Sequence, residues 1–251
     1  MAAEVESLVA DWDAFRGEGI QKAAGAGNRV SLLYPREGER VEILRSAVSA
    51  LNPENVLIGL TGLSFLIMVV NSGYELDLGA WRRILDAAGC PVWLDIHSLT
   101  LERVLGRPRT YRAVPEWEDW ALGTAYLQAN RKEVACMLGT PEQEAGNEEI
   151  RAFCRRALDL GLKAVFVTLG REGALVATPE AEIMARPARD VEVMDTTGCG
   201  DVFCAAAASV LSRGASPGEA ARFGTDLASR AAQVAGVRAA YELAQKIARL
   251  S

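Results

Sequence analysis

The sequence lacks the residue patterns of several common protein classes. It contains one histidine, and its five cysteines form no Cys-x-x-Cys pair, which argues against a zinc site. No Gly-x-x-x-x-Gly-Lys-Ser/Thr segment occurs, and no strand pattern is followed by Gly-x-Gly-x-x-Gly. These absences exclude a P-loop kinase on pattern and argue against a Rossmann dehydrogenase.

A basic surplus and a long hydrophobic run are also missing. The net charge is −6 and no Lys/Arg-rich run appears, so no nucleic-acid partner is expected. The acidic first six residues do not resemble a secretory signal. One apolar run, residues 56–70, is interrupted by Thr61 and Gly62 and is short for a spanning helix. We expect two buried strands there, or a strand and a short turn, in a cytoplasmic protein with no membrane partner.

What remains is a composition typical of globular proteins. The 251 residues are 50% hydrophobic and 24% charged. This length supports one sizeable core, and we expect a single α/β domain.

Hydrophobic periodicity predicts a β hairpin followed by alternating strands and helices. Two β-rich runs at 29–34 and 40–44 flank a Pro/Gly turn. Strand and helix patterns then alternate, which favours a parallel sheet covered on both faces. The predicted strands are 64–71, 91–96, 125–130, 163–168 and an antiparallel pair at 173–178 and 182–186. The predicted helices are 1–19, 78–88, 131–138, 147–160, one ending near 213, one starting at 216 and one at 239–250.

Residues 195–201, Asp-Thr-Thr-Gly-Cys-Gly-Asp, carry the strongest chemical signal. They lead into an Ala-rich segment of high helix propensity. A Gly-x-Gly turn that opens a helix leaves backbone N–H groups unpaired at the positive end of the helix dipole, where anions bind. The carboxylate of Asp201 is expected beside this position, so the stretch suggests phosphoryl transfer.

Residues 130–133, Asn-Arg-Lys-Glu, lie between a predicted strand and a predicted helix. Asn130 as N-cap and Glu133 at the third helical position form the pattern of a capping box, which is the structural interpretation. The functional alternative is that this amide and carboxylate hold a hydrated Mg²⁺ on phosphate oxygens.

Two further segments follow predicted strands. Thr168-Leu-Gly170-Arg-Glu-Gly173 is either a turn between strands or part of a nucleotide site, because ligands of open α/β sheets bind at the carboxyl ends of strands. Asp95 is either a turn residue or a contact to substrate or to a phosphate-bound cation. For His97 we expect a hydrogen-bonded structural role, since no nucleophile motif surrounds it.

In this order, these segments resemble the ribokinase-like, PfkB-type family of sugar and nucleoside kinases. Residues 195–203 follow its signature Asp-Thr-x-Gly-Ala-Gly-Asp-x-Phe, with Cys199 in place of the usual alanine. Asn130-x-x-Glu133 is similar to the family's Asn-x-x-Glu motif, and residues 168–173 are similar to its Thr-x-Gly-x-x-Gly segment. The motif-like pieces spread over roughly residues 50–240, which makes the resemblance specific.

The resemblance implies a three-layer α/β/α sandwich with a mostly parallel sheet and a small β lid. Residues 1–251 would form one kinase domain, with a lid-like hairpin at about 20–50 and a nucleotide-binding core at 51–251. A homodimer through the lid is compatible with this organisation.

The resemblance also implies transfer of the γ-phosphoryl group of ATP to a hydroxyl of a sugar-like substrate. The expected roles are a catalytic base (Asp201), an anion hole (Gly198, Cys199, Gly200), Mg²⁺ positioning (Asn130, Glu133) and nucleotide contacts (Asn130, Thr168, Gly170, Gly173, Gly198, Gly200). Some members also use a monovalent cation near the positions of Asp195 and Thr197, and the sequence leaves this requirement open.

One departure from the family concerns its beginning. Members usually start with strands that carry a substrate-binding Asp and a Gly-Gly-x-x-x-Asn motif, and neither occurs here. We expect either a truncated chain, a start that lies upstream, or a shortened relative with another binding mode. The alternative function is a catalytically impaired nucleotide-binding protein with a regulatory or structural role.

Overall fold

The computed structural model describes residues 27–33, 41–187, 191–236 and 242. The predicted helices at 1–19 and 239–250 lie outside the described residues. Within the described ranges, no helix combines the length and the apolar character needed to cross a bilayer.

A six-stranded sheet forms the centre of the molecule, with strands in the order β3-β4-β5-β6-β7-β8. The first four strands are parallel, and β7 and β8 are added antiparallel, as the sequence predicts. The strands are β3 (Leu66–Val69), β4 (Val92–Asp95), β5 (Tyr126–Asn130), β6 (Ala164–Thr168), β7 (Ala174–Ala177) and β8 (Glu182–Ala185).

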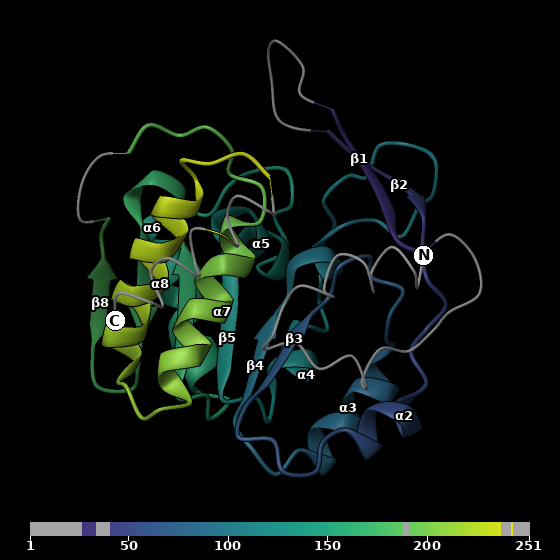
Figure 1. The fold of residues 1–251 in the computed structure, drawn as a ribbon, viewed down its shortest axis with the longest axis horizontal. Helices are drawn as coiled ribbons and strands as arrows, with labels where there is room; N and C mark the ends of the chain where they lie inside the picture. The colour runs from purple at the N-terminus through teal and green to yellow at the C-terminus, as the bar shows by residue number, and fades with distance from the viewer. Residues whose placement is uncertain (1–26, 34–40, 188–190, 237–241, 243–251) are drawn as a thin grey trace.

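Helices cover both faces of this sheet (Figure 1). One face packs against α3, α4, α5 and α6, and the other packs against α7 and α8. The helices are α2 (Pro53–Ile58), α3 (Leu78–Ala87), α4 (Trp117–Ala121), α5 (Arg131–Met137), α6 (Asn147–Leu158), α7 (Cys199–Leu211) and α8 (Pro217–Ala231). The expected layering of helix, sheet and helix is confirmed.

The predicted hairpin is present as a separate antiparallel pair, β1 (Arg29–Leu33) and β2 (Val41–Ser46). It projects from the body near the carboxyl ends of β3 and β4 (Figure 1). The buried side chain of Arg109 connects it to the body, donating from Nη1 to Glu42 Oε1 at 2.9 Å and from Nη2 to the Ser72 carbonyl at 2.9 Å.

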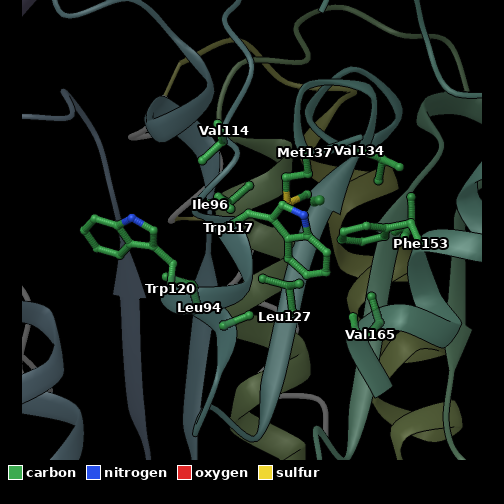
Figure 2. Packing of buried hydrophobic residues seen from close by; sticks show 14 of the residues in the cluster. Leu94, Ile96, Val114, Trp117, Trp120, Leu127, Val134, Met137, Phe153 and Val165 are labelled. Carbon is green, nitrogen blue, oxygen red and sulfur yellow. The ribbon is translucent and has the colours of Figure 1, made fainter. Parts of the chain in front are cut away.

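Alternation along the strands divides the core into two clusters. Leu94, Leu127 and Val165 face α5 and α6, where the Trp117 and Phe153 rings lie 4.9 Å apart between centroids (Figure 2). The opposite side chains of the same strands, Trp93, Tyr126 and Phe166, form an aromatic layer beneath α7, and Phe203 of α7 packs against Phe166.

One expectation about local structure is wrong. The run at 56–70 is neither two strands nor a strand and a short turn, because its first part belongs to α2. Asn52 accepts a hydrogen bond from the Glu54 N–H, and Pro53 occupies the first helical position, so local capping outweighs the apolar composition. After β4, beyond the end of the predicted strand, the chain forms a 3₁₀ helix, η2 (His97–Thr100), for which the sequence analysis made no prediction.

Candidate active site

The N-terminus of α7 lies at the carboxyl ends of the parallel strands. Gly198 is its N-cap, with φ 79° and ψ 0°, a left-handed conformation that glycine adopts without steric cost. The Cys199 N–H donates to the Thr196 carbonyl at 3.2 Å, and the Val202 N–H donates to the Gly198 carbonyl at 2.9 Å. No acceptor for the N–H groups of Gly198 and Gly200 occurs in the described part of the chain, so both remain available to an anion.

The capping box at the start of α5 is formed as the structural interpretation predicts. Asn130 Oδ1 accepts the Glu133 N–H at 2.9 Å, and Glu133 Oε2 accepts the Asn130 N–H at 2.8 Å. The other carboxylate oxygen, Oε1, lies 3.5 Å from His97 Nδ1. Glu133 is buried, with 6% of its surface exposed.

Thr168 ends β6, and Gly170 begins the short 3₁₀ helix η3 (Gly170–Glu172). Gly173 follows with φ 99°, and a Cβ there would lie 2.0 Å from the Ala185 carbonyl oxygen. Only glycine fits here, where the chain entering β7 passes the end of β8, so Gly173 has a structural role independent of any ligand.

A cavity of about 640 Å³ unites most of the predicted site residues. Its walls come from the ends of β5 and β6, from the first turn of α7 and from α8. Predicted residues in the lining are Asn130, Thr168, Gly170, Gly173, Cys199 and Gly200. Its volume lies within the range of small-molecule sites, about 300–1,000 Å³.

Helix α8 contributes residues that the sequence analysis missed. Thr225 lines the cavity and is only 5% exposed, and no partner for its hydroxyl is present among the described residues. A buried hydroxyl without a partner costs free energy, so a ligand that bonds it would remove this cost. No local motif marks Thr225, because its place in the wall depends on the packing of α8 against α7.

A second cavity of about 570 Å³ shares Asn130, Thr168 and Gly170 with the first. Glu133 and His97 line this second cavity rather than the first. The structure therefore places the motif segments along one continuous rim, with the Asn130 region between two hollows.

Asp201 lines neither cavity, and its side chain is exposed in the first turn of α7. The charge of its carboxylate nevertheless acts on both Asp95 and His97. The predicted base therefore lies next to a group of ionisable residues at the end of β4.

The pKa values of two residues in this group, Asp95 and His97, are shifted far from their ordinary values, which the sequence did not predict. Burial raises the pKa of Asp95 to about 8, and the charges of Glu133 and Asp201 act in the same direction, while His97 opposes them. Burial lowers the pKa of His97, but the hydrogen bond and charge of Glu133, together with Asp95 and Asp201, raise it to about 9. His97 also has φ 25°, the one positive value among the non-glycine residues of the described ranges. Perturbed titration and backbone strain both concentrate at functional sites.

The Cys199 thiol does not have the properties of a nucleophile. Burial raises its pKa, and the negative charges of Asp195 and Asp201 add to this effect. A thiol held in its protonated form is unreactive, so Cys199 contributes to the turn through its backbone.

The residues present offer few direct ligands for a Mg²⁺ ion bound to a nucleotide. In the described part of the molecule, no group of three or more His, Cys, Asp or Glu side chains is arranged to hold a metal ion. Glu133 Oε1 and the Asn130 amide could therefore hold the ion mainly through its water shell, with phosphate oxygens as the other ligands. Mg²⁺ commonly keeps several waters and binds in this way.

Comparison with known proteins identifies the family of the chain. Residues 103–244 match the model of the pfkB family of carbohydrate kinases. The chain is 39% identical over 114 residues to a 1-phosphofructokinase of Haloferax volcanii, covering 43% of this chain and 35% of that protein. It is 33% identical over 103 residues to a ribokinase of Schizosaccharomyces pombe, covering 41% and 32%. These matches span about a third of the length of the curated relatives.

Solved structures extend the likeness to the fold. Ribokinase from Thermotoga maritima superposes with a TM-score of 0.65 at 24% identity, over 85% of this chain and 65% of that one. Ribokinase of Arabidopsis thaliana, solved with ribose and ATP, gives 0.65 at 22% identity and the same coverage. The expected ribokinase-like α/β architecture is confirmed.

Proposed function

This chain belongs to the pfkB family of carbohydrate kinases, and from that premise we propose that it transfers the γ-phosphoryl group of ATP to a hydroxyl of a small sugar-like molecule. One observation carries the proposal. The first turn of α7 carries backbone N–H groups that have no acceptor among the described residues, together with the acidic side chain of Asp201, and Cys199 and Gly200 of this turn line a cavity of about 640 Å³ at the carboxyl ends of the strands.

The proposed reaction is an in-line displacement at phosphorus. The acceptor oxygen forms a bond to the γ-phosphorus, the bond from that phosphorus to the bridging oxygen of ADP breaks, and Asp201 accepts the hydroxyl proton. The N–H groups of Gly198 and Gly200 stabilise the charge of the transferring group, and the Cys199 peptide completes the turn. Positioning and electrostatics dominate such reactions, so a carboxylate is a sufficient base.

The remaining predicted residues would bind the nucleotide. Asn130, Thr168, Gly170 and Gly173 line its path, and we assign the buried Thr225 hydroxyl to a hydrogen bond with the nucleoside end. Asn130 and Glu133 would orient the water shell of a Mg²⁺ ion, which neutralises phosphate charge when bound.

The hairpin suits a contact between two copies of the chain. Val30 and Leu33 on β1 are 44% and 49% exposed, and the pair extends away from the sheet (Figure 1). We therefore assign it to a homodimer. Sedimentation of the parent and of Val30→Glu/Leu33→Glu tests this: a dimer that dissociates in the variant supports it, and a monomeric parent overturns it.

The deciding experiment measures ADP release with Mg²⁺ and ATP across sugars, sugar acids, polyols and nucleosides. Acceptor-dependent release is expected. In parallel, millimolar ATP with Mg²⁺ should raise the melting temperature, because binding to the folded state stabilises it. A thermal shift without release from any acceptor would instead support the catalytically impaired nucleotide-binding protein. If ATP causes no thermal shift and no acceptor supports ADP release, both functions are contradicted.

A further inference from the structure

Two polar side chains interrupt the aromatic layer beneath α7. Along β4 and β5 the residues that face α7 are Trp93 and Tyr126, and the next residues on the same face are Asp95 and Gln128. Parallel pairing places Asp95 directly beside Gln128, and they are 5% and 3% exposed. Burying an amide and a carboxyl group costs free energy that an apolar pair would avoid. Their position beneath the first turn of α7 therefore needs a reason.

The Gln128 amide connects the sheet to the helix. Its Nε2 donates to the Gly200 carbonyl at 3.1 Å and to Asp95 Oδ2 at 3.1 Å. An amide nitrogen has two hydrogens, so these two bonds use all of its donors. Its carbonyl oxygen Oε1 is buried and has no hydrogen-bond partner in the described residues. The contact thus keeps one polar atom unsatisfied, which a purely stabilising arrangement would avoid.

The position of the acceptor gives this bond a consequence for the site. The carbonyl of Gly200 and the N–H of Asp201 belong to one planar peptide group and point in opposite directions. A bond from the sheet to the carbonyl therefore directs the Asp201 N–H away from the sheet, toward the open end of the helix. Because Asp201 has the φ of a helical residue, the orientation of this plane also sets the direction in which its side chain leaves the backbone.

Asp95 fixes the amide in turn. Its Oδ2 accepts from Gln128, and its Oδ1 accepts the His97 N–H at 3.2 Å. Because an acceptor lies on the Asp95 side, the amide presents Nε2 rather than Oε1 to the Gly200 carbonyl. We propose that Gln128, held by Asp95, is a positioning residue that orients the anion-binding turn and the base at Asp201. This inference rests on the proposed kinase function.

Substitution of Gln128 tests the role. Gln128→Met keeps the side-chain volume and removes the two hydrogen bonds. We expect kcat to fall by about 10- to 100-fold, as for a misoriented transition-state donor, with a smaller change in the KM for ATP. Leu127→Met is the matched control, because Leu127 is the neighbouring buried residue on the opposite face of β5. It should leave kcat within about twofold, as volume-conserving exchanges do.

Coupling between the two residues separates positioning from simple stability. Asp95→Asn keeps an acceptor for Nε2 and should retain most of kcat, whereas Asp95→Leu should lose as much as Gln128→Met. The double variant Asp95→Leu/Gln128→Met should be no slower than either single variant, because both break one path. The inference would be overturned if the loss of kcat in the double variant equalled the product of the two single losses. It would also be overturned if the kcat of Gln128→Met stayed within twofold of the parent.

A second readout does not require turnover. In the parent, addition of sulfate should shift the backbone amide resonances of Gly200 and Asp201, and in Gln128→Met this response should weaken at least threefold. An equal response in both proteins overturns the positioning role. A parent that binds sulfate but phosphorylates no acceptor refutes the kinase function and leaves the positioning role to be decided by this measurement.

Discussion

The two faces of the sheet differ most where the strands end. On the face toward α5 and α6, Leu94, Leu127 and Val165 continue as an apolar core (Figure 2). On the face toward α7, the aromatic layer gives way to Asp95 and Gln128. Hydrophobic burial stabilises the first face, whereas the second carries buried polar groups at the point where α7 begins. Stability and chemistry are thus assigned to opposite sides of the same strands.

The largest effect should come from the α7 side. Asp201→Asn removes the base while keeping the shape of the side chain, so kcat should fall by about 10³-fold, within the range for general bases. Binding of ATP with Mg²⁺, measured by calorimetry, should stay near that of the parent. Asp119→Asn, at an acid that lies 3.8 Å from Arg82 on the surface, is the control. Turnover within a few-fold of the parent would refute the assignment of the base.

Substitutions on the opposite face of the sheet should lower the stability of the fold and leave kcat nearly unchanged. Phe153→Ala empties a fully buried position against Trp117, which costs about 3–5 kcal/mol in such cores. For a chain of this size that corresponds to a fall in melting temperature of about 10 °C. Kinetics well below the transition should be nearly unchanged. A fall in kcat comparable to that of Gln128→Met would mean that the two faces are not independent.

The sequence predicted much of this division and missed its central contact. Alternating strand patterns and the capping pattern at Asn130 are local, and each was confirmed where the structure describes it. The bond between Gln128 and Gly200 joins residues 72 positions apart and depends on the register of β4 and β5, which no local pattern encodes. A glutamine among apolar neighbours in residues 126–129 was the one available signal. The start of α2 was also signalled, by Asn52 and Pro53, and was outweighed by its apolar composition.

Titration offers a further test of the polar side. The pKa of Asp95 is raised from 3.8 to about 8 by burial and by Glu133 and Asp201, so the folded state binds more protons than the unfolded state between these values. The free energy of unfolding should therefore fall as pH rises through this window, by about 3–4 kcal/mol between about pH 5 and pH 8. His97, which faces Asp95, has its pKa raised to about 9 and acts in the same direction.

Urea midpoints at the two pH values measure this loss. Asp95→Asn should remove most of the slope, because an amide does not ionise. Asp119→Asn should leave it unchanged, since that carboxylate is exposed. An unaltered slope in Asp95→Asn would show that the stability difference arises elsewhere.

The smallest effect is expected from alanine substitution of the glycines near the two ends of α7. Gly198 and Gly214 both have positive φ, 79° and 92°, and at either position an added Cβ would meet no atom closer than 3.9 Å. Substitution by alanine should therefore cost each variant a similar 1–2 kcal/mol, about the price of a left-handed conformation. Only Gly198→Ala changes the turn whose N–H groups face the site, so only this variant should weaken ATP binding, by about tenfold for a loss of 1.4 kcal/mol. Equal weakening in both variants would mean that global destabilisation, rather than the geometry of the turn, governs nucleotide affinity.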